Sequence, residues 1–455
     1  MASTFFGLTI AYSGLQAANT SLTITGHNVS NINTKGYTRQ QAGTQAADAL
    51  RTHTTYGAIG SGVVVTEISQ IRDSYYDVKY RNNMANYGQY SVKESYMGQI
   101  EDYLDEFTLN GYSQEYKNFF SAVNQLTITP GDTSAKNQLI NNAKSLADYF
   151  NTLTTNLRNV QADANNEIKD AVQQINSYAK NIAALNRQIN QIEANYGNAN
   201  DLRDKRNAMI DELSEIVNLE TSEEDMGNNV SNFSVRINGQ TLVSSYSYNT
   251  LETVARTDKK NYSDAEGLYD VQWNSGQKFD MYSTSLSGHL KGLIDIRDGN
   301  NGEHENIETD DDGNNVTDSD GNLVLTTAPA ADKTVSYKGV PYYQAQLNEF
   351  AKIFSDAVNK IMKSGYTSDG SSKGISLFVT QPNTTVMSAG NITVNPELLK
   401  NADLLAIKKE QNDGESDAKI MEELNKLQSE KIFAGGTGSY FLERRLLICI
   451  RIILI

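Results

Sequence analysis

The sequence has few of the residues that crosslink a chain or bind metals. Among its 455 residues are one cysteine, one tryptophan, four histidines and five prolines. The single thiol, Cys449, allows neither an internal disulfide nor a cysteine-based zinc site. A chain with few prolines and no disulfide suits export through a channel in the unfolded state, although many cytosolic proteins share this profile.

Positive charge is also scarce. The chain has 39 Lys and Arg against 55 Asp and Glu, a formal net charge of −16. Nucleic acid binds basic surfaces, so this balance argues against a nucleic-acid partner, and it opposes binding to anionic membranes. The N-terminal residues lack the basic and long apolar regions of a cleaved signal peptide. One apolar stretch, 446–455, is interrupted by Arg451 and is too short to span a bilayer.

Motifs for catalysis or metal binding are not recognisable. The four histidines, among them His27 and His289, form no His-Glu-x-x-His motif, and no Gly-x-x-x-x-Gly-Lys-Ser/Thr phosphate loop occurs. The acidic run 299–321 invites a calcium interpretation. However, placing Gly313 or Gly321 at position six of a twelve-residue calcium loop puts Ser or Thr where Glu is needed. The sequence therefore predicts no catalytic residue, no metal site and no cofactor.

A heptad pattern dominates the first forty residues. Apolar residues recur every seven positions, with companions three positions later, which predicts a helix with one narrow apolar seam. The flanking residues are mainly Ser, Thr, Asn and Gln, so such a helix is marginal by itself and needs packing against other segments or copies. The predicted assembly seam consists of Leu8, Ala11, Leu15, Ala18, Leu22, Val29 and Ile32.

The helix leads into an Asn-rich turn. Asn and Ser side chains offer the backbone alternatives to helical hydrogen bonds, and Gly36 is predicted to take a positive φ. The predicted turn motif is Asn28, Asn31, Gly36 and Tyr37. The Ala-, Thr- and Gly-rich residues 41–62 that follow are predicted to be a loop.

The longest regular stretch runs from residue 135 to residue 196. Ile recurs every seven positions from Ile168, and Ala171, Tyr178, Leu185 and Ile192 fill the companion positions, which predicts a long coiled-coil-like helix capped by Ser134. At about 1.5 Å per residue it would reach about 90 Å. A return helix follows at 201–216. The residues predicted to pack this rod are Ile168, Ile175, Ile182, Leu185, Ile189 and Leu213.

Beyond residue 228 the pattern becomes period two, with Asn238-Gly239 as a hairpin turn. The helical period returns at 343–362 and again at 416–432. The predicted fold is mainly α with an inserted β-rich domain, α+β overall. Its predicted parts are a helix and turn at 1–62, a helical rod at 63–228, a β-rich domain at 229–343, return helices with a short β-rich segment at 344–441, and an atypical apolar tail at 442–455.

Several of these segments resemble known proteins. Residues 7–8, 13–15, 26–31 and 34–40 are similar to the N-terminal signature of the bacterial flagellar axial proteins, which comprise rod, hook and hook-associated proteins. Residues 201–213, 231–243, 288–298 and 346–359 resemble, in the same order, segments of the hook-associated protein 1 family of the hook–filament junction. In that family a long C-terminal helix pairs with the N-terminal helix. The tail 442–455 lacks its heptads, which suggests a frameshift or truncation.

The resemblance implies a structural subunit, not an enzyme, that joins hook to filament outside the cell. It implies self-assembly into a ring or tube, contacts with hook protein and a second junction protein, and export by the flagellar apparatus without a cleaved signal peptide. The family's export chaperone binds the C-terminal helix, so its site is expected to be absent here. Alternatives are another axial protein, such as hook or distal rod, or a secreted module that binds Ca²⁺ or glycan.

Overall fold

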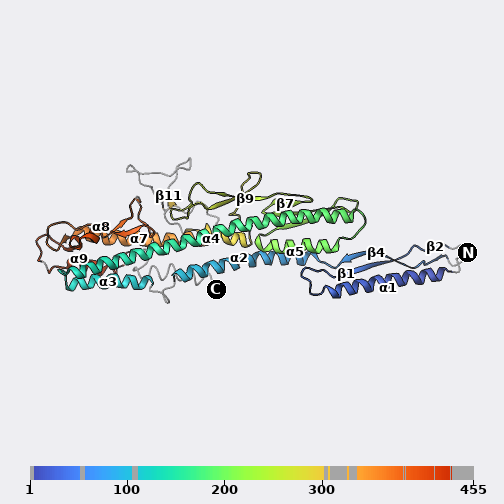
Figure 1. Cartoon of the computed structure of the whole chain (residues 1–455), viewed down its shortest axis with the longest axis horizontal. Helices are drawn as coiled ribbons and strands as arrows, with labels where there is room; N and C mark the ends of the chain where they lie inside the picture. Colours follow the sequence, from blue (N-terminus) through green and yellow to red (C-terminus); the bar gives the residue numbers. More distant parts are fainter. Residues whose placement is uncertain are drawn as a thin grey trace. The chain divides into compact units, whose positions relative to one another are not determined.

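Helices are the main elements of the structure, a computed structural model (Figure 1). It describes residues 5–51, 57–104, 111–301, 306–307, 325–326, 336–382, 384, 386–414, 416–430 and 432. The chain divides into two compact units. The first comprises Met1–Gln89, Asp170–Thr253 and Val271–Leu290, and the second comprises Tyr90–Lys169, Val254–Asp270 and Lys291–Ile455.

Five elements contribute residues to both units. They are α2 (Ser74–Leu104), α4 (Thr133–Glu193), α6 (His289–Arg297), β9 (Leu251–Ala255) and β10 (Tyr269–Trp273). At about 1.5 Å per residue, the 61 residues of α4 span about 90 Å. The sequence prediction of one long helix is confirmed.

The first unit combines the N-terminal helix with a hairpin, a second helix and a sheet. Strands β1 and β4 pair antiparallel, from Gln40 opposite Gln70 to Ala46 opposite Val63. Strands β5 to β8 form one antiparallel sheet in chain order, and the predicted turn at Asn238 and Gly239 joins β6 to β7 with positive φ at both residues. The elements are α1 (Phe6–Ser30), β1 (Gln40–Ala46), β2 (Leu50–Arg51), β3 (Ala58–Ile59), β4 (Val63–Gln70), α5 (Asn200–Ile216), β5 (Glu220–Asp225), β6 (Ser231–Ile237), β7 (Gln240–Ser244) and β8 (Ser247–Tyr248).

The second unit is held together by aromatic side chains. Phe119 of α3, Phe350 and Phe354 of α7, Phe150 of α4 and Phe378 of β14 are buried, and the rings of Phe350 and Phe354 stack with centroids 5.6 Å apart. The elements are α3 (Tyr112–Ile128), β11 (Asn306–Ile307), β12 (Leu325–Thr326), α7 (Val340–Ser364), β13 (Tyr366–Thr367), β14 (Phe378–Thr380), β15 (Ile392–Val394), α8 (Pro396–Lys400), η1 (Ala402–Leu404), β16 (Ala406–Lys408) and α9 (Lys419–Lys426).

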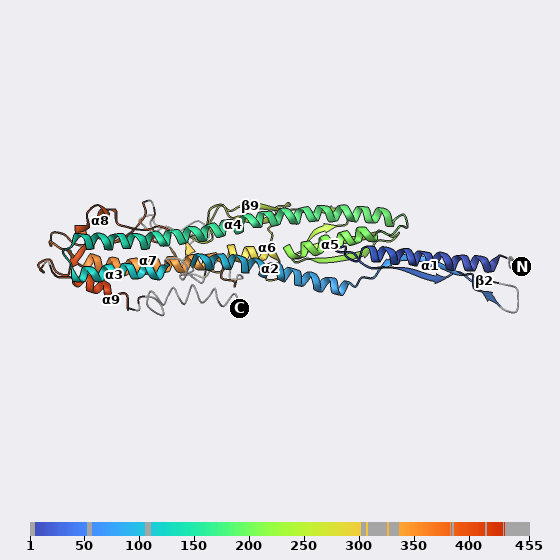
Figure 2. The ribbon, with the colours of Figure 1, turned by 60° about the horizontal axis from the view of Figure 1, so that its bottom comes forward.

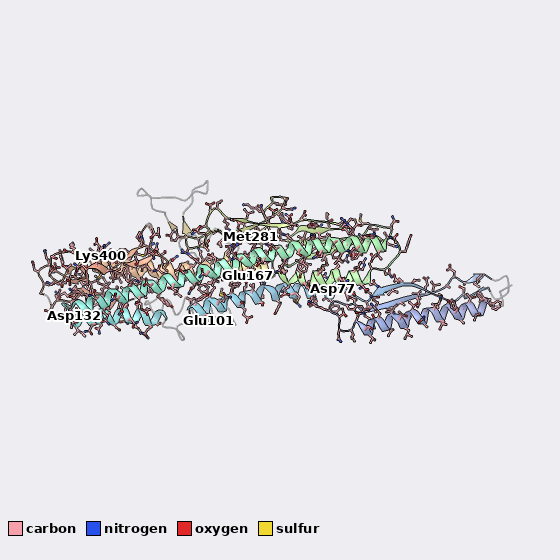
Figure 3. The ribbon with its side chains drawn as sticks, viewed as in Figure 1. Asp77, Glu101, Asp132, Glu167, Met281 and Lys400 are labelled. Atoms are coloured by element: carbon pink, nitrogen blue, oxygen red, sulfur yellow. The ribbon has the colours of Figure 1, made fainter. Side chains whose placement is uncertain are left out.

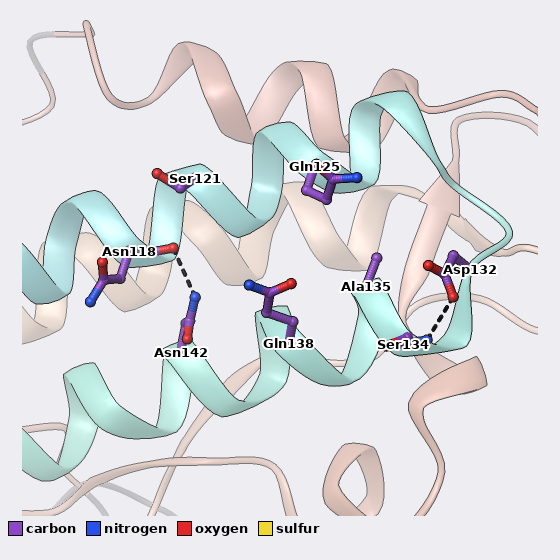
Figure 4. A pocket seen from close by; sticks show the side chains of 8 residues that line it. All are labelled: Asn118, Ser121, Gln125, Asp132, Ser134, Ala135, Gln138 and Asn142. Atoms are coloured by element: carbon purple, nitrogen blue, oxygen red, sulfur yellow. Dashed lines mark hydrogen bonds between the residues drawn. The ribbon is translucent and has the colours of Figure 1, made fainter.

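Most predicted elements are present, and the predicted fold class is confirmed. Three local predictions are wrong. Residues 41–62 contain strands; because β1 is mostly exposed, its sequence shows no alternation of apolar and polar residues. Asp132, not Ser134, caps α4, since its carboxylate accepts the Ser134 N–H at 2.9 Å (Figure 4). The helix expected at 416–432 is shorter, at Lys419–Lys426. The domain boundaries inferred from the sequence remain predictions, and the acidic run and the tail lie almost entirely outside the described residues.

The buried face of α4 is turned by about one residue from the expected one. Ile168, Ile175, Ile182 and Ile189 are buried, as is Leu213 of α5, but Leu185 is half-buried and Ile192 is exposed. Of the expected companions, Ala171 is buried. Val172, Ala179 and Asn186, each one residue later than an expected companion, are buried as well. The apolar pattern of the sequence did not indicate this face, because one of its core positions is occupied by an asparagine, Asn186.

Asparagines on this face of α4 bind backbone of the β layer in the first unit. Asn176 both donates to the Leu251 C=O and accepts from its N–H, each at 2.8 Å. Asn190 does the same with Ser231, at 2.7 and 3.0 Å. Asn186 donates to the carbonyls of Phe233 and Ser245. We call these three residues the amide ladder. It supplies side-chain hydrogen bonds to backbone groups of the β layer.

Candidate assembly site

Helix α1 has two faces, and one of them packs on the β1–β4 hairpin. In both views α1 runs alongside this hairpin (Figures 1 and 2). The covered positions include Ile10, Ser13, Ala17, Thr20 and Ile24, of which Ala17 and Ile24 are buried. The Ser13 hydroxyl accepts the Val63 N–H at the start of β4, at 3.2 Å. These contacts fix which side of α1 faces the hairpin.

The predicted assembly seam is on the other side of the helix. At 3.6 residues per turn its centre lies roughly 140° around the helix from the packed face. Ala11 and Ala18 are exposed. The large seam side chains are Leu8, 67% exposed, Leu15, 67%, Leu22, 71%, Val29, 65%, and Ile32, 77%. A continuous exposed apolar stripe of this kind marks a surface that binds another protein segment.

Asn28 holds the turn that follows α1. Its carboxamide oxygen accepts from the Gln40 N–H at 2.9 Å and from the Tyr37 hydroxyl at 2.8 Å, and its NH₂ group donates to the Gln40 C=O at 2.9 Å. One side chain therefore binds both backbone groups of the first residue of β1. The role of Asn28 as part of an assembly site stays a prediction.

The other residues of the turn motif bind locally. Asn31 donates to the His27 C=O and accepts from the Thr34 hydroxyl. Gly36 has φ +80°, as predicted, and a Cβ there would lie 3.0 Å from the Ala208 Cβ. The Tyr37 hydroxyl also contacts His27 Nδ1 at 2.9 Å. Burial is the main reason that the pKa of Tyr37 is raised, and the negative charges of Asp201 and Asp204 raise it further.

Helix α5 anchors the turn within the first unit. The carboxylate of Asp204 accepts the Thr38 N–H at 3.0 Å, and Lys35 pairs with Glu212 at 3.0 Å. Asp204 is buried, although a single sequence offers no direct reason to select it. At 3.6 residues per turn it lies well away from the side that carries Leu202, Met209 and Leu213, so the apolar pattern held no signal for it.

A charged cluster on α5 lies beside this anchor, and it was not predicted from the sequence. Arg203 pairs with Glu193 at 2.7 Å and with Glu223 at 3.0 Å, and buried Arg206 pairs with Glu223 at 3.2 Å. The Arg206 guanidinium also lies 3.8 Å from the centre of the Phe233 ring. Burial lowers the pKa of Arg206 to about 10, which leaves it charged at neutral pH.

The described residues offer little for catalysis. They contain no group of three or more His, Cys, Asp or Glu side chains that could hold a metal ion. A groove of about 380 Å³ lies between α3 and α4, where Gln138 and Asn142 point toward α3 (Figure 4). Its lining is mostly amide and hydroxyl groups: Asn118, Ser121, Gln125, Asp132, Ser134, Ala135, Gln138 and Asn142. Such groups supply hydrogen bonds but not a paired acid and base.

One spacing that is typical of hydrolases was overlooked in the conclusion that the sequence contains no motif for catalysis. Residues 370–374 have the spacing Gly-x-Ser-x-Gly, which in hydrolases forms a sharp turn between a strand and a helix. Here the segment follows β13, and the backbone N–H and C=O of Ser372 bind Thr367. It is a tight polar loop and not a nucleophile turn. Among the described helices, none is both long and apolar enough to cross a membrane.

Comparison with known proteins identifies the family. The family model described as "Flagellar hook-associated protein FlgK helical domain" matches residues 97–378. The chain belongs to this flagellar hook-associated protein family. The prediction made from the sequence motifs is thereby confirmed, and it places the chain among the structural proteins of the flagellum.

Curated relatives agree with this assignment. Flagellar hook-associated protein 1 of Bacillus subtilis is 27% identical over 390 residues, 82% of this chain and 70% of the relative. The Salmonella typhimurium protein of the same name is 33% identical over 219 residues, 48% of this chain and 39% of the relative. The chain thus spans well under half of the Salmonella protein. The solved structure of the flagellar hook junction protein FlgK from Burkholderia pseudomallei is 23% identical, with a TM-score of 0.49, covering 66% of this chain and 46% of that one.

Proposed function

We propose that this chain is a structural subunit that joins the flagellar hook to the filament and assembles through the seam of α1. The observation that carries the proposal is the exposure of Leu8, Leu15, Leu22, Val29 and Ile32 on one side of a helix whose other side is already packed. Packing of neighbouring subunits on this stripe would remove its apolar surface from water. This would stabilise the assembly by about 25 cal/mol for each Å² of apolar surface buried.

The proposed mechanism is assembly rather than catalysis. The terminal helix is only weakly held in the single molecule and becomes ordered when neighbouring copies bury its seam, so that intersubunit contacts offset the entropy cost of ordering. The turn around Asn28 and its anchor on α5 then set the direction in which the helix leaves the rest of the first unit. The copies would form a ring or tube.

The family assignment supports further parts of the proposal. We infer that hook protein lies on one side of this ring and a second junction protein on the other. The chain would reach the outside of the cell through the flagellar export apparatus, without a cleaved signal peptide. In the family, the export chaperone binds a C-terminal helix; here the corresponding tail, 442–455, lies outside the described residues.

Cells that lack their own copy of the protein provide the test. The seam variant carries Leu8→Ser, Leu15→Ser and Leu22→Ser, and the matched control carries Thr9→Ser, Gln16→Ser and Thr23→Ser at exposed positions of the same helix outside the seam. The two quantities measured are the protein secreted into the medium and the protein retained in isolated flagella. We expect both variants to be secreted but only the control to be retained and to restore motility. Normal retention of the seam variant would refute the proposal.

A further inference from the structure

Helix α2 exposes tyrosines along one side of its first turns. Tyr76, Tyr80 and Tyr87 are 68%, 51% and 61% exposed, and Asn83 between them is also exposed. The spacing of four, three and four residues places these four side chains within roughly 60° of arc on the helix. We call these four residues the tyrosine face. All of them belong to the first unit.

The opposite side of α2 is fixed to α5. Buried Arg81 binds Asp211 at 2.7 Å. Gly88 packs against the backbone of Glu215 so closely that a Cβ at residue 88 would overlap the Glu215 carbonyl. Because these contacts set the rotation of α2 about its axis, the tyrosines cannot turn inward without breaking them. The tyrosine face is therefore a fixed outer surface of the first unit.

This surface is almost without net charge in a chain with a net charge of −16. The charged residues of α2 up to Gly88 are Asp77, Lys79 and Arg81. Asp77, in the first turn of α2 (Figure 3), binds Arg72 at 2.6 Å. The ammonium group of Lys79 lies 4.7 Å from the centre of the Tyr75 ring. The centres of protein–protein interfaces are rich in tyrosine and poor in acidic residues. The tyrosine face has this composition.

We propose that the tyrosine face contacts a second copy of this chain. The inference rests on the proposed function, because a ring or tube built from one kind of chain needs two different faces on each copy. The exposed seam of α1 provides one such face. Two copies with a net charge of −16 repel each other, so a second contact is least costly where exposed acidic side chains are few, and α2 provides such a surface.

A photo-crosslinking residue tests which molecule lies against this surface. p-Benzoylphenylalanine replaces Tyr80 in the full chain, in cells that assemble flagella, and in a control chain it replaces Tyr196, which is 90% exposed at the end of α4 in the first unit. Isolated flagella are irradiated and the joined peptides are identified by mass spectrometry. We expect crosslinks between two copies of this chain from position 80 and at least about tenfold fewer from position 196. Crosslinks from position 80 only to another protein, or none, would overturn the inference.

A second variant separates this inference from the proposed function. Tyr76→Ser, Tyr80→Ser and Tyr87→Ser remove the aromatic rings from positions that are exposed, so circular dichroism should match that of the unchanged chain. We expect retention in isolated flagella to fall by at least about tenfold, since buried interface tyrosines often contribute that much or more. If the unchanged chain is retained and this folded variant is retained equally, the tyrosine inference fails alone. If the unchanged chain itself is not retained, the proposed function fails, and the inference fails with it.

Discussion

Single side chains in this protein fix backbone that regular secondary structure leaves without partners. Asn28 holds both backbone groups of Gln40, and Asp204 holds the N–H of Thr38. The importance of Asn28 and Gly36 could be predicted, because amide side chains and positive φ are local properties of a turn. The role of Asp204 could not, because it depends on a contact 166 positions away in the sequence.

Asn28→Ala should loosen the turn. The substitution removes the hydrogen bonds to Gln40 and Tyr37 and leaves the two Gln40 backbone groups without that partner, at a cost of about 1–3 kcal/mol. Hydrogen exchange of the Gln40 amide should become about tenfold to a hundredfold faster. Asn33→Ala, at an exposed position of the same turn, is the control and should leave that rate unchanged.

Gly36→Ala and Gly14→Ala should have opposite effects. At Gly36 the backbone has φ +80° and the new methyl group would press on Ala208, so we expect a loss of about 1–2 kcal/mol. At Gly14 a Cβ meets nothing within 4 Å inside α1, and alanine should favour the helix by up to about 1 kcal/mol. Hydrogen exchange measures both effects: it should become faster across residues 30–40 in Gly36→Ala and slower across α1 in Gly14→Ala. Equal effects would show that the positive φ is not required.

Glu223 should make the stability of the first unit sensitive to acid. Burial alone would raise the pKa of its carboxyl, but Arg206, the Ser231 hydroxyl and Arg203 outweigh burial and lower it below the ordinary 4.5. Because the pKa is lower in the folded state, the stabilisation is complete above the unfolded value and is lost as pH falls through the folded value. Trp273, buried in the first unit, reports unfolding by fluorescence. In urea titrations, the free energy of unfolding of the unchanged chain should exceed that of Glu223→Gln most near pH 7. This difference should shrink below about pH 4.5.

At the scale of elements, the sequence predicts helices better than it predicts strands or packing faces. Heptads in α4 identify a long helix because the apolar period persists over many turns. A short strand at Val63, Val65 and Ile68 could be predicted, and it is β4. Its partner β1 was missed because a mostly exposed strand needs no apolar alternation. The face of α4 was misjudged by one position because its core includes the amide ladder, and an asparagine that binds strand backbone looks like a surface residue in a sequence.

Asn176→Ala tests the amide ladder. It leaves the N–H and C=O of Leu251 without their side-chain partner, and we expect a loss of about 1–3 kcal/mol in the first unit. The urea midpoint reported by Trp273 fluorescence should fall. Gln174→Ala, at an exposed position of the same helix, should leave the midpoint within experimental error. A similar fall for both variants would mean that the loss is not specific to the ladder.

At the scale of the whole chain, the proposed assembly mechanism makes the N-terminal helix the part whose stability depends most on other molecules. Removal of residues 1–39 deletes α1 and its turn. It also deletes the contacts of Lys35, Gly36 and Thr38 with α5, which lie at one end of the first unit's core. The buried apolar residues of α4, α5 and the β5–β8 sheet keep their partners, and among the buried polar residues Asp204 loses the Thr38 N–H. We therefore expect the shortened chain to keep the circular dichroism of its remaining helices and nearly the same urea midpoint by Trp273 fluorescence, while losing retention in flagella. If the deletion instead unfolds the rest of the first unit, α1 is ordinary core, and the assembly mechanism proposed for its seam is wrong.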